Sequence, residues 1–164
     1  ESAFLHASRS ANVPCMTESD MPSRWPAWKR VPPFLPVPLR ARADGWTPDR
    51  QARFIGFLAE TGSVAEAARR VGMSRMAAYR LRRRKGAASF AHAWDAIAGF
   101  WQGEPVAPRK VTPAELFERA HEGEFHILMR RRKFIRALRK PSTSALLRHL
   151  RRMDALAGRG GLDW

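Results

Sequence analysis

Apolar positions at helical spacing predict a first helix in the middle of the chain. In "GWTPDRQARFIGFLAETG", Phe54, Ile55 and Leu58 fall on one face, as in a helix that buries one side. Thr47 is placed to cap this helix. Pro48 suits its first position, because a backbone N–H there would have no acceptor within the helix. We expect the helix to end at the glycine that closes the segment.

The next segment, "SVAEAARRVGMSRMAAYRLRRRKG", predicts two short helices joined by a tight turn. Ser63 and Glu66 have the spacing of a capping box, which starts the second helix. Gly72 supplies the turn, and Ser74 caps a third helix that we expect to run to about Arg84. The residues expected to pack in the angle between these two helices are Ala67, Ala68, Val71, Met73, Ala78 and Leu81.

The outer face of the third helix is basic. Six cations and no acid lie between Ser74 and Lys85. Because an α-helix fits the major groove of B-DNA, a rigidly held helix with such a face is expected to bind DNA. The alternative is a three-helix bundle whose basic face is only solvated.

These residues carry a resemblance to a known motif. Ala68, Gly72 and Leu81, with Ser74 opening the last helix, resemble the homeodomain-like helix-turn-helix of bacterial and phage DNA-binding proteins. The run "GWTPDRQARFIGFLAETGSVAEAARRVGMSRMAAYRLRRRKGAASFAHAWDA" is similar to a group of alphaproteobacterial helix-turn-helix proteins, themselves similar to phage terminase small subunits, and covers about a third of the chain.

The resemblance implies a recognition helix over residues 74–84. The residues that it implies as base contacts are Arg75, Met76, Tyr79 and Arg80. The phosphate contacts that we expect on and just after this helix are Ser74, Arg82, Arg83, Arg84 and Lys85. Of these, Arg82 is expected to point sideways and to contact phosphate alone.

A fourth helix is predicted in "ASFAHAWDAIAGFW". Phe90, Trp94, Ile97 and Trp101 share one helical face, which either packs on the first helix or forms a dimer seam. The glycine and prolines of "GEPVAPRK" then interrupt the periodicity, which indicates a linker over 102–111.

The region after this linker begins with another predicted helix, "TPAELFERAHEG". Thr112 caps it and Glu115 completes a second capping box, with Leu116, Phe117 and Ala120 on the buried side. Residues 124–140 are ambiguous: the sequence fits both a strand pair and a helical stripe, and the related helix-turn-helix proteins favour a short hairpin. After it, "STSALLRHLRRMDAL" predicts an amphipathic helix with a leucine-rich face.

Seven cations and no acid lie between Arg130 and Lys140. This run is either a second surface that contacts phosphates or a patch that water solvates. On the first interpretation, the phosphate contacts are Arg131, Arg132 and Lys133.

The N-terminal region has a different character. Prolines recur from Pro22 to Pro38, with tryptophans in "RWPAWKR", and this density removes amide donors that helices and sheets need. We expect a disordered arm over 1–43. It either is a plain linker or, through "RWPAWKR", Arg40 and Arg42, reaches along a DNA groove or docks on a partner. Residues 1–15 precede Met16 and are either an upstream extension or a fusion remnant.

Composition agrees with a polyanionic partner. The chain of 164 residues has 30 Lys and Arg against 15 Asp and Glu, a net charge of +15, which favours nucleic acid through counterion release. No apolar run approaches the roughly 18 residues of a membrane span. We therefore expect a cytoplasmic, nucleoid-associated protein with no membrane partner.

The sequence offers no catalytic or metal-binding constellation. Cys15 is a lone cysteine, and His121 and His126 are five residues apart, whereas two ligands on one helical face need a spacing of four. No glycine-rich phosphate loop follows a predicted strand. We expect no enzyme activity, no metal, no cofactor and no small-molecule substrate.

Together these patterns predict a mainly α protein: a homeodomain-like helix-turn-helix, then amphipathic helices and a short β-hairpin or helix in the C-terminal part. The predicted division is an arm (1–43), a DNA-binding domain (44–101), a linker (102–111), a basic C-terminal region that forms a homo-oligomer (112–157) and a disordered tail (158–164). The predicted function is sequence-preferring binding of double-stranded DNA by a dimeric transcriptional regulator. The alternative is a ring-forming recognition factor similar to a terminase small subunit.

Overall fold

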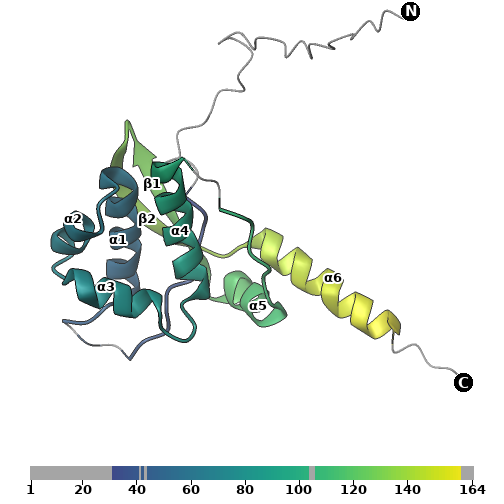
Figure 1. Ribbon diagram of the computed structural model, residues 1–164. Coiled ribbons are helices and arrows are strands. Elements are labelled where there is room, and N and C mark those ends of the chain that lie inside the picture. Colours follow the sequence, from purple (N-terminus) through teal and green to yellow (C-terminus); the bar gives the residue numbers. More distant parts are fainter. Residues whose placement is uncertain (1–30, 41, 43, 104–105, 160–164) are drawn as a thin grey trace, which may run out of the picture.

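The computed structural model describes residues 31–40, 42, 44–103 and 106–159 (Figure 1). These residues form six helices and one antiparallel hairpin, which confirms the mainly helical fold and decides for a hairpin over residues 124–140. The elements are α1 (Pro48–Thr61), α2 (Val64–Arg70), α3 (Arg75–Arg82), α4 (Ala88–Gln102), α5 (Pro113–His121), β1 (Glu124–Arg130), β2 (Lys133–Lys140) and α6 (Thr143–Arg159).

The first three helices have the predicted caps. The side chains of Thr47, Ser63 and Ser74 each accept a hydrogen bond from a backbone N–H in the first turn of their helix. The connections at Gly62 and Gly72 have φ angles of 67° and 71°, a left-handed conformation that glycine adopts without steric cost. The starts of these helices and the turns between them therefore follow from local chemistry.

The segment before α1 corrects a prediction. The disordered arm was expected to reach residue 43, but Phe34 is 0% exposed and exchanges two backbone hydrogen bonds with Phe125 of β1. Val37 is also buried, and its N–H and carbonyl pair with the side-chain amide of Gln51 on α1. Prolines remove donors only at their own positions, so the apolar residues between them still enter the core. The predicted arm over 1–30 lies outside the described residues.

The core is a cluster of aromatic rings from segments far apart in the sequence. The ring of Phe34 lies 5.8 Å from that of Phe90 and 6.0 Å from that of Phe125, and the rings of Phe54 and Trp94 are 4.9 Å apart. The predicted stripe of α4 thus packs on α1, although Trp101 at its end is 41% exposed.

The hairpin belongs to this same core, which corrects the division into two ordered regions. Both strands pack on α1, and the ring of Phe134 lies against Gly56. The register shifts between Leu128 and Met129, so Phe134 and Ala137, three residues apart on β2, both face α1. A bulge of this kind cannot be read from alternation alone.

Helix α5 is tied to the body by Arg119. Its guanidinium bonds to Glu115 of the same helix, to Glu124 of β1 and to Ser89 of α4. The Glu115 carboxylate also pairs with Arg109, so it does not return to the cap at Thr112 as a capping box would require.

Helix α6 packs on α5 at its start and then projects from the body (Figure 1). It continues to Arg159, which corrects the predicted tail from residue 158; residues 160–164 lie outside the described part. Its exposed apolar residues are Leu146, Leu147, Leu150, Met153 and Leu156. Phe117 of α5, expected inside, is also exposed. No helix among the described residues has the length and apolarity to cross a membrane.

Candidate nucleic-acid interface

Helix α3 is fixed by its inner face. Ala78 and Leu81 are buried in the core, and the Ser74 hydroxyl accepts a hydrogen bond from the N–H of Ala77 at 3.1 Å. Opposite this face, Arg75, Met76 and Arg80 are exposed, as predicted for base contacts. The helix therefore presents these side chains from a rigid support.

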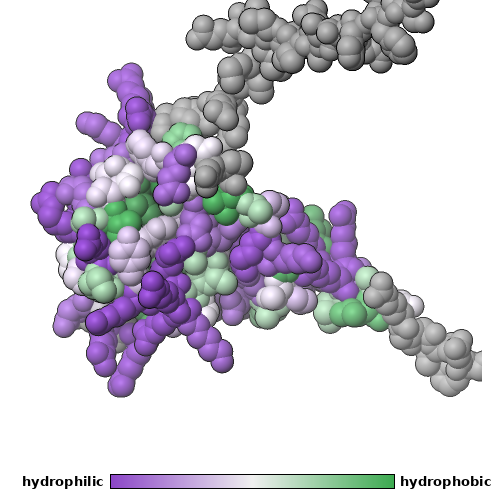
Figure 2. All heavy atoms as spheres, viewed as in Figure 1, coloured by the Kyte–Doolittle hydropathy of each residue, from purple (hydrophilic) through white to green (hydrophobic). Residues whose placement is uncertain are grey.

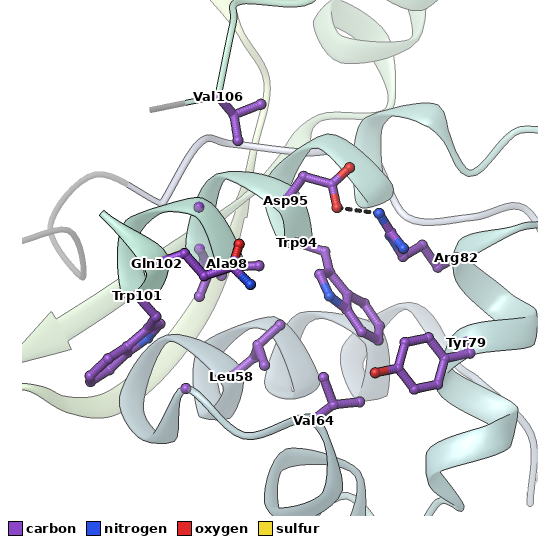
Figure 3. A pocket seen from close by; sticks show the side chains of 13 residues that line it. Leu58, Val64, Tyr79, Arg82, Trp94, Asp95, Ala98, Trp101, Gln102 and Val106 are labelled. Atoms are coloured by element: carbon purple, nitrogen blue, oxygen red, sulfur yellow. Dashed lines mark hydrogen bonds and ion pairs between the residues drawn. The ribbon is translucent and has the colours of Figure 1, made fainter. Parts of the chain in front are cut away.

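Tyr79, predicted to contact bases, is half-buried, and its ring is turned toward α4. Its ring packs against Trp94 of α4, with ring centroids 5.5 Å apart, and borders a cavity between α1, α3 and α4 (Figure 3). Burying the large ring of Tyr79 against Trp94 is more favourable than exposing it to water. Tyr79 positions α3.

Arg82 is likewise directed inward, which leaves its predicted phosphate contact without support. Its Nη2 donates to Oδ1 of Asp95 at 2.5 Å, and its Cζ lies 5.7 Å from the centre of the Trp94 ring (Figure 3). No sequence pattern pointed to this pair, because Arg82 and Asp95 meet only when α3 and α4 pack.

The cations that follow Arg82 are exposed, whereas Arg82 is half-buried. Helix α3 ends at Arg82, two residues before its predicted end, and Arg83, Arg84 and Lys85 follow on the exposed turn into α4. Within the described part of the chain, none of them pairs with a carboxylate, and neither do Arg75 and Arg80. We call Arg75, Arg80, Arg83, Arg84 and Lys85 the α3 cations.

The arginines of α2 are neutralised by neighbours. Arg69 pairs with Glu66, and Arg70 bridges Glu66 and Glu60. Hydrogen bonds from Arg69 and then Arg70 hold the pKa of the Glu66 carboxyl below its usual value. Because Glu66 faces these arginines, the capping box is only half formed: the N–H of Ser63 donates to Oγ1 of Thr61 instead.

The segment before α1 adds cations near α3. Pro38 lies beside Gly86, just after the α3 cations. Arg40 and Arg42 of this segment are exposed. They extend the basic surface beyond the helix itself.

A second basic surface lies at the turn of the hairpin. We call Arg130, Arg131, Arg132 and Lys133 the hairpin tip; all four are exposed. Arg131 and Arg132 are the two central turn residues, with φ angles of 47° and 65°. A two-residue turn with two positive φ angles normally contains Asn and Gly, so two arginines there are unusual.

The hairpin tip is anchored at the C-terminal end of α1. The N–H of Phe134 donates to Oε2 of Glu60 at 2.8 Å, and the guanidinium of Arg132 lies 5.8 Å from the Trp101 ring. Burial acts to raise the pKa of Glu60, but the hydrogen bonds from Phe134 and Arg70 outweigh it, so that pKa lies below its usual value. Sequence reasoning missed Glu60 and Trp101 here, because no spacing links them to the hairpin.

The geometry thus presents two basic surfaces suited to phosphate oxygens. Among the residues that the structure covers, no three His, Cys, Asp or Glu side chains gather as a metal site would require. Comparison of the chain with protein-family models, with curated proteins and with solved structures found no match.

Proposed function

We propose that the protein binds double-stranded DNA by placing α3 in the major groove. The observation that carries this proposal is the sorting of charge: the α3 cations have no carboxylate partner among the described residues, whereas the arginines of α2 are paired. Unpaired cations on a rigid helix gain most from the phosphates and base edges of a duplex.

Within this proposal the roles of the side chains differ. Arg75, Met76 and Arg80 face the bases, since they lie on the exposed side of α3. Arg83, Arg84 and Lys85 contact phosphates beside the groove, together with the hydroxyl of Ser74, whose hydrogen remains available while its oxygen caps the helix. Tyr79 and Arg82 hold α3 against α4 and touch no DNA.

Selection from a random DNA pool tests the proposal. An arginine that binds guanine through two hydrogen bonds contributes about 1 to 3 kcal/mol of discrimination, so Arg80→Ala should relax preference at one or two base pairs. Arg53→Ala, which removes an exposed arginine of α1 outside α3, is the matched control and should leave the motif intact. Identical motifs for wild type and Arg80→Ala would reject base reading by Arg80.

The proposed biological role is a transcriptional regulator that acts in the cytoplasm as a homo-oligomer. The uncovered leucine face of α6 favours self-association, and a dimer would place two α3 helices on half-sites about one turn of DNA apart. A ring of about eight or more copies would instead support the alternative, a terminase-like assembly factor. The mass of the protein in solution separates the two.

A further inference from the structure

The two basic surfaces lie toward opposite ends of α1 (Figure 1). Helix α1 has 14 residues and is therefore about 21 Å long. Helix α3 crosses toward its N-terminal end, while the hairpin turn extends past its C-terminal end (Figure 1). Figure 2, in the same view, shows hydrophilic side chains projecting at both ends.

The hairpin tip is held in place by three independent contacts. Glu60 accepts from the N–H of Phe134, the Phe134 ring sits in the space beside Gly56, and Trp101 packs over Gly62 beneath Arg132. A tip fixed to the end of α1 cannot fold back toward α3. The two surfaces therefore keep their separation.

The turn of the hairpin places two arginines in a strained backbone conformation. Residues other than glycine are strained at positive φ when the surroundings enforce that conformation. Arg131 and Arg132 both adopt it, and with Arg130 and Lys133 they form four successive exposed cations. Within the described chain none of the four forms an ion pair with a carboxylate, although the charge of Lys133 contributes to the lowered pKa of Glu60.

We propose that the hairpin tip binds the phosphate backbone of a second DNA duplex, so that one chain bridges two DNA segments. The inference rests on the proposed function in taking α3 as the first site. The four cations of the tip have no apolar residue between them, which suits closely spaced phosphates better than the interface of a membrane. Reaching both surfaces with one duplex would require bending it around α1, and bending a short duplex costs free energy.

The test uses the full chain and two short duplexes. One duplex is immobilised on beads, the other is fluorescent, and captured fluorescence reports bridging. The central variant is Arg131→Asn with Arg132→Gly, which removes two charges and installs the residue pair that this turn prefers, so the hairpin is retained. Arg131→Lys with Arg132→Lys keeps the charge, and Leu150→Asp removes an exposed leucine of α6 that an oligomer would use.

Wild type is expected to capture the second duplex, and the Asn–Gly variant to capture about tenfold less at moderate salt. The Lys–Lys variant should capture as wild type does, and Leu150→Asp should still bridge. In sedimentation with excess duplex that is long enough for only one α3 helix, wild type should bind two duplexes per chain and the Asn–Gly variant one.

Undiminished capture by the Asn–Gly variant would overturn the proposal, and so would loss of capture on Leu150→Asp, which would assign bridging to an oligomer. Binding of only one duplex by wild type would also overturn it. A separate variant tests the proposed function. We expect Arg75→Ala with Arg80→Ala to bind one duplex per chain, and binding of two duplexes, as in wild type, would contradict DNA binding by α3.

Discussion

The ring of Phe134 on β2 occupies the space in which a Cβ at Gly56 would lie. A Cβ built there would be 2.2 Å from Cδ2 of that ring. The glycine thus lets the hairpin approach the axis of α1 closely, and this contact joins the C-terminal region to the helix-turn-helix.

Gly56→Ala is expected to destabilise the protein by about 1 to 3 kcal/mol, because the ring must leave its place. Helix propensity alone predicts the opposite sign, a gain of about 1 kcal/mol. Gly158→Ala on α6, where a Cβ meets nothing within 4 Å, is the matched control and should be neutral or stabilising. Urea unfolding measures both, and a gain for Gly56→Ala would contradict this packing.

Gln51→Leu should cost about 2 to 5 kcal/mol, because it leaves the buried N–H and carbonyl of Val37 without partners. The leucine has a similar volume, so the loss reports hydrogen bonding more than packing. Limited proteolysis should then cut near residues 31–40 faster than in wild type. Equal stability and equal cleavage would show that this segment does not depend on Gln51.

Arg82→Ala should lower the free energy of unfolding by about 1 kcal/mol, through loss of the Asp95 pair and of contact with Trp94. Arg80→Ala, two residues earlier and on the outer face, should change it by less than about 0.5 kcal/mol. A double-mutant cycle with Asp95→Asn isolates the pair. Absence of coupling would remove the assigned link between α3 and α4.

Stability should fall at acidic pH partly through Glu60. Since its pKa is lower in the folded protein, its contribution is fully present above the ordinary value of 4.5 and is lost as the pH falls through the folded value. Glu60→Gln should therefore cost about 1 kcal/mol at neutral pH and progressively less below pH 4.5. Glu118→Gln, an exposed position on α5, is the control. A pH-independent difference between wild type and Glu60→Gln would contradict the linkage.

Arg131→Asn with Arg132→Gly should raise the free energy of unfolding by about 1 to 2 kcal/mol, since it relieves two residues at positive φ. The same variant is expected to lose bridging, so stability and function should move in opposite directions. Thermal unfolding provides the measurement. A loss of stability would show that the arginines do not strain the turn.

The sequence by itself determined the helices, their N-caps and the turn glycines, because these depend on neighbours within a few residues. Ser74 caps α3 and Gly72 takes a left-handed conformation as expected. Local chemistry also indicated the exposed face of α3, since Ala78 and Leu81 had to lie opposite it.

Only the tertiary structure decided which cations remain available. Arg82 and Arg83 are neighbours in sequence, yet Arg82 meets Asp95 and Arg83 does not, because α4 packs against one side of α3 alone. Likewise, Phe34 and Phe125 meet in the core although about ninety residues separate them in the sequence. No local pattern encodes such a contact, because it depends on closing a long loop and on the packing of the whole core. Composition predicts that the chain is basic, and packing decides where its charge faces outward.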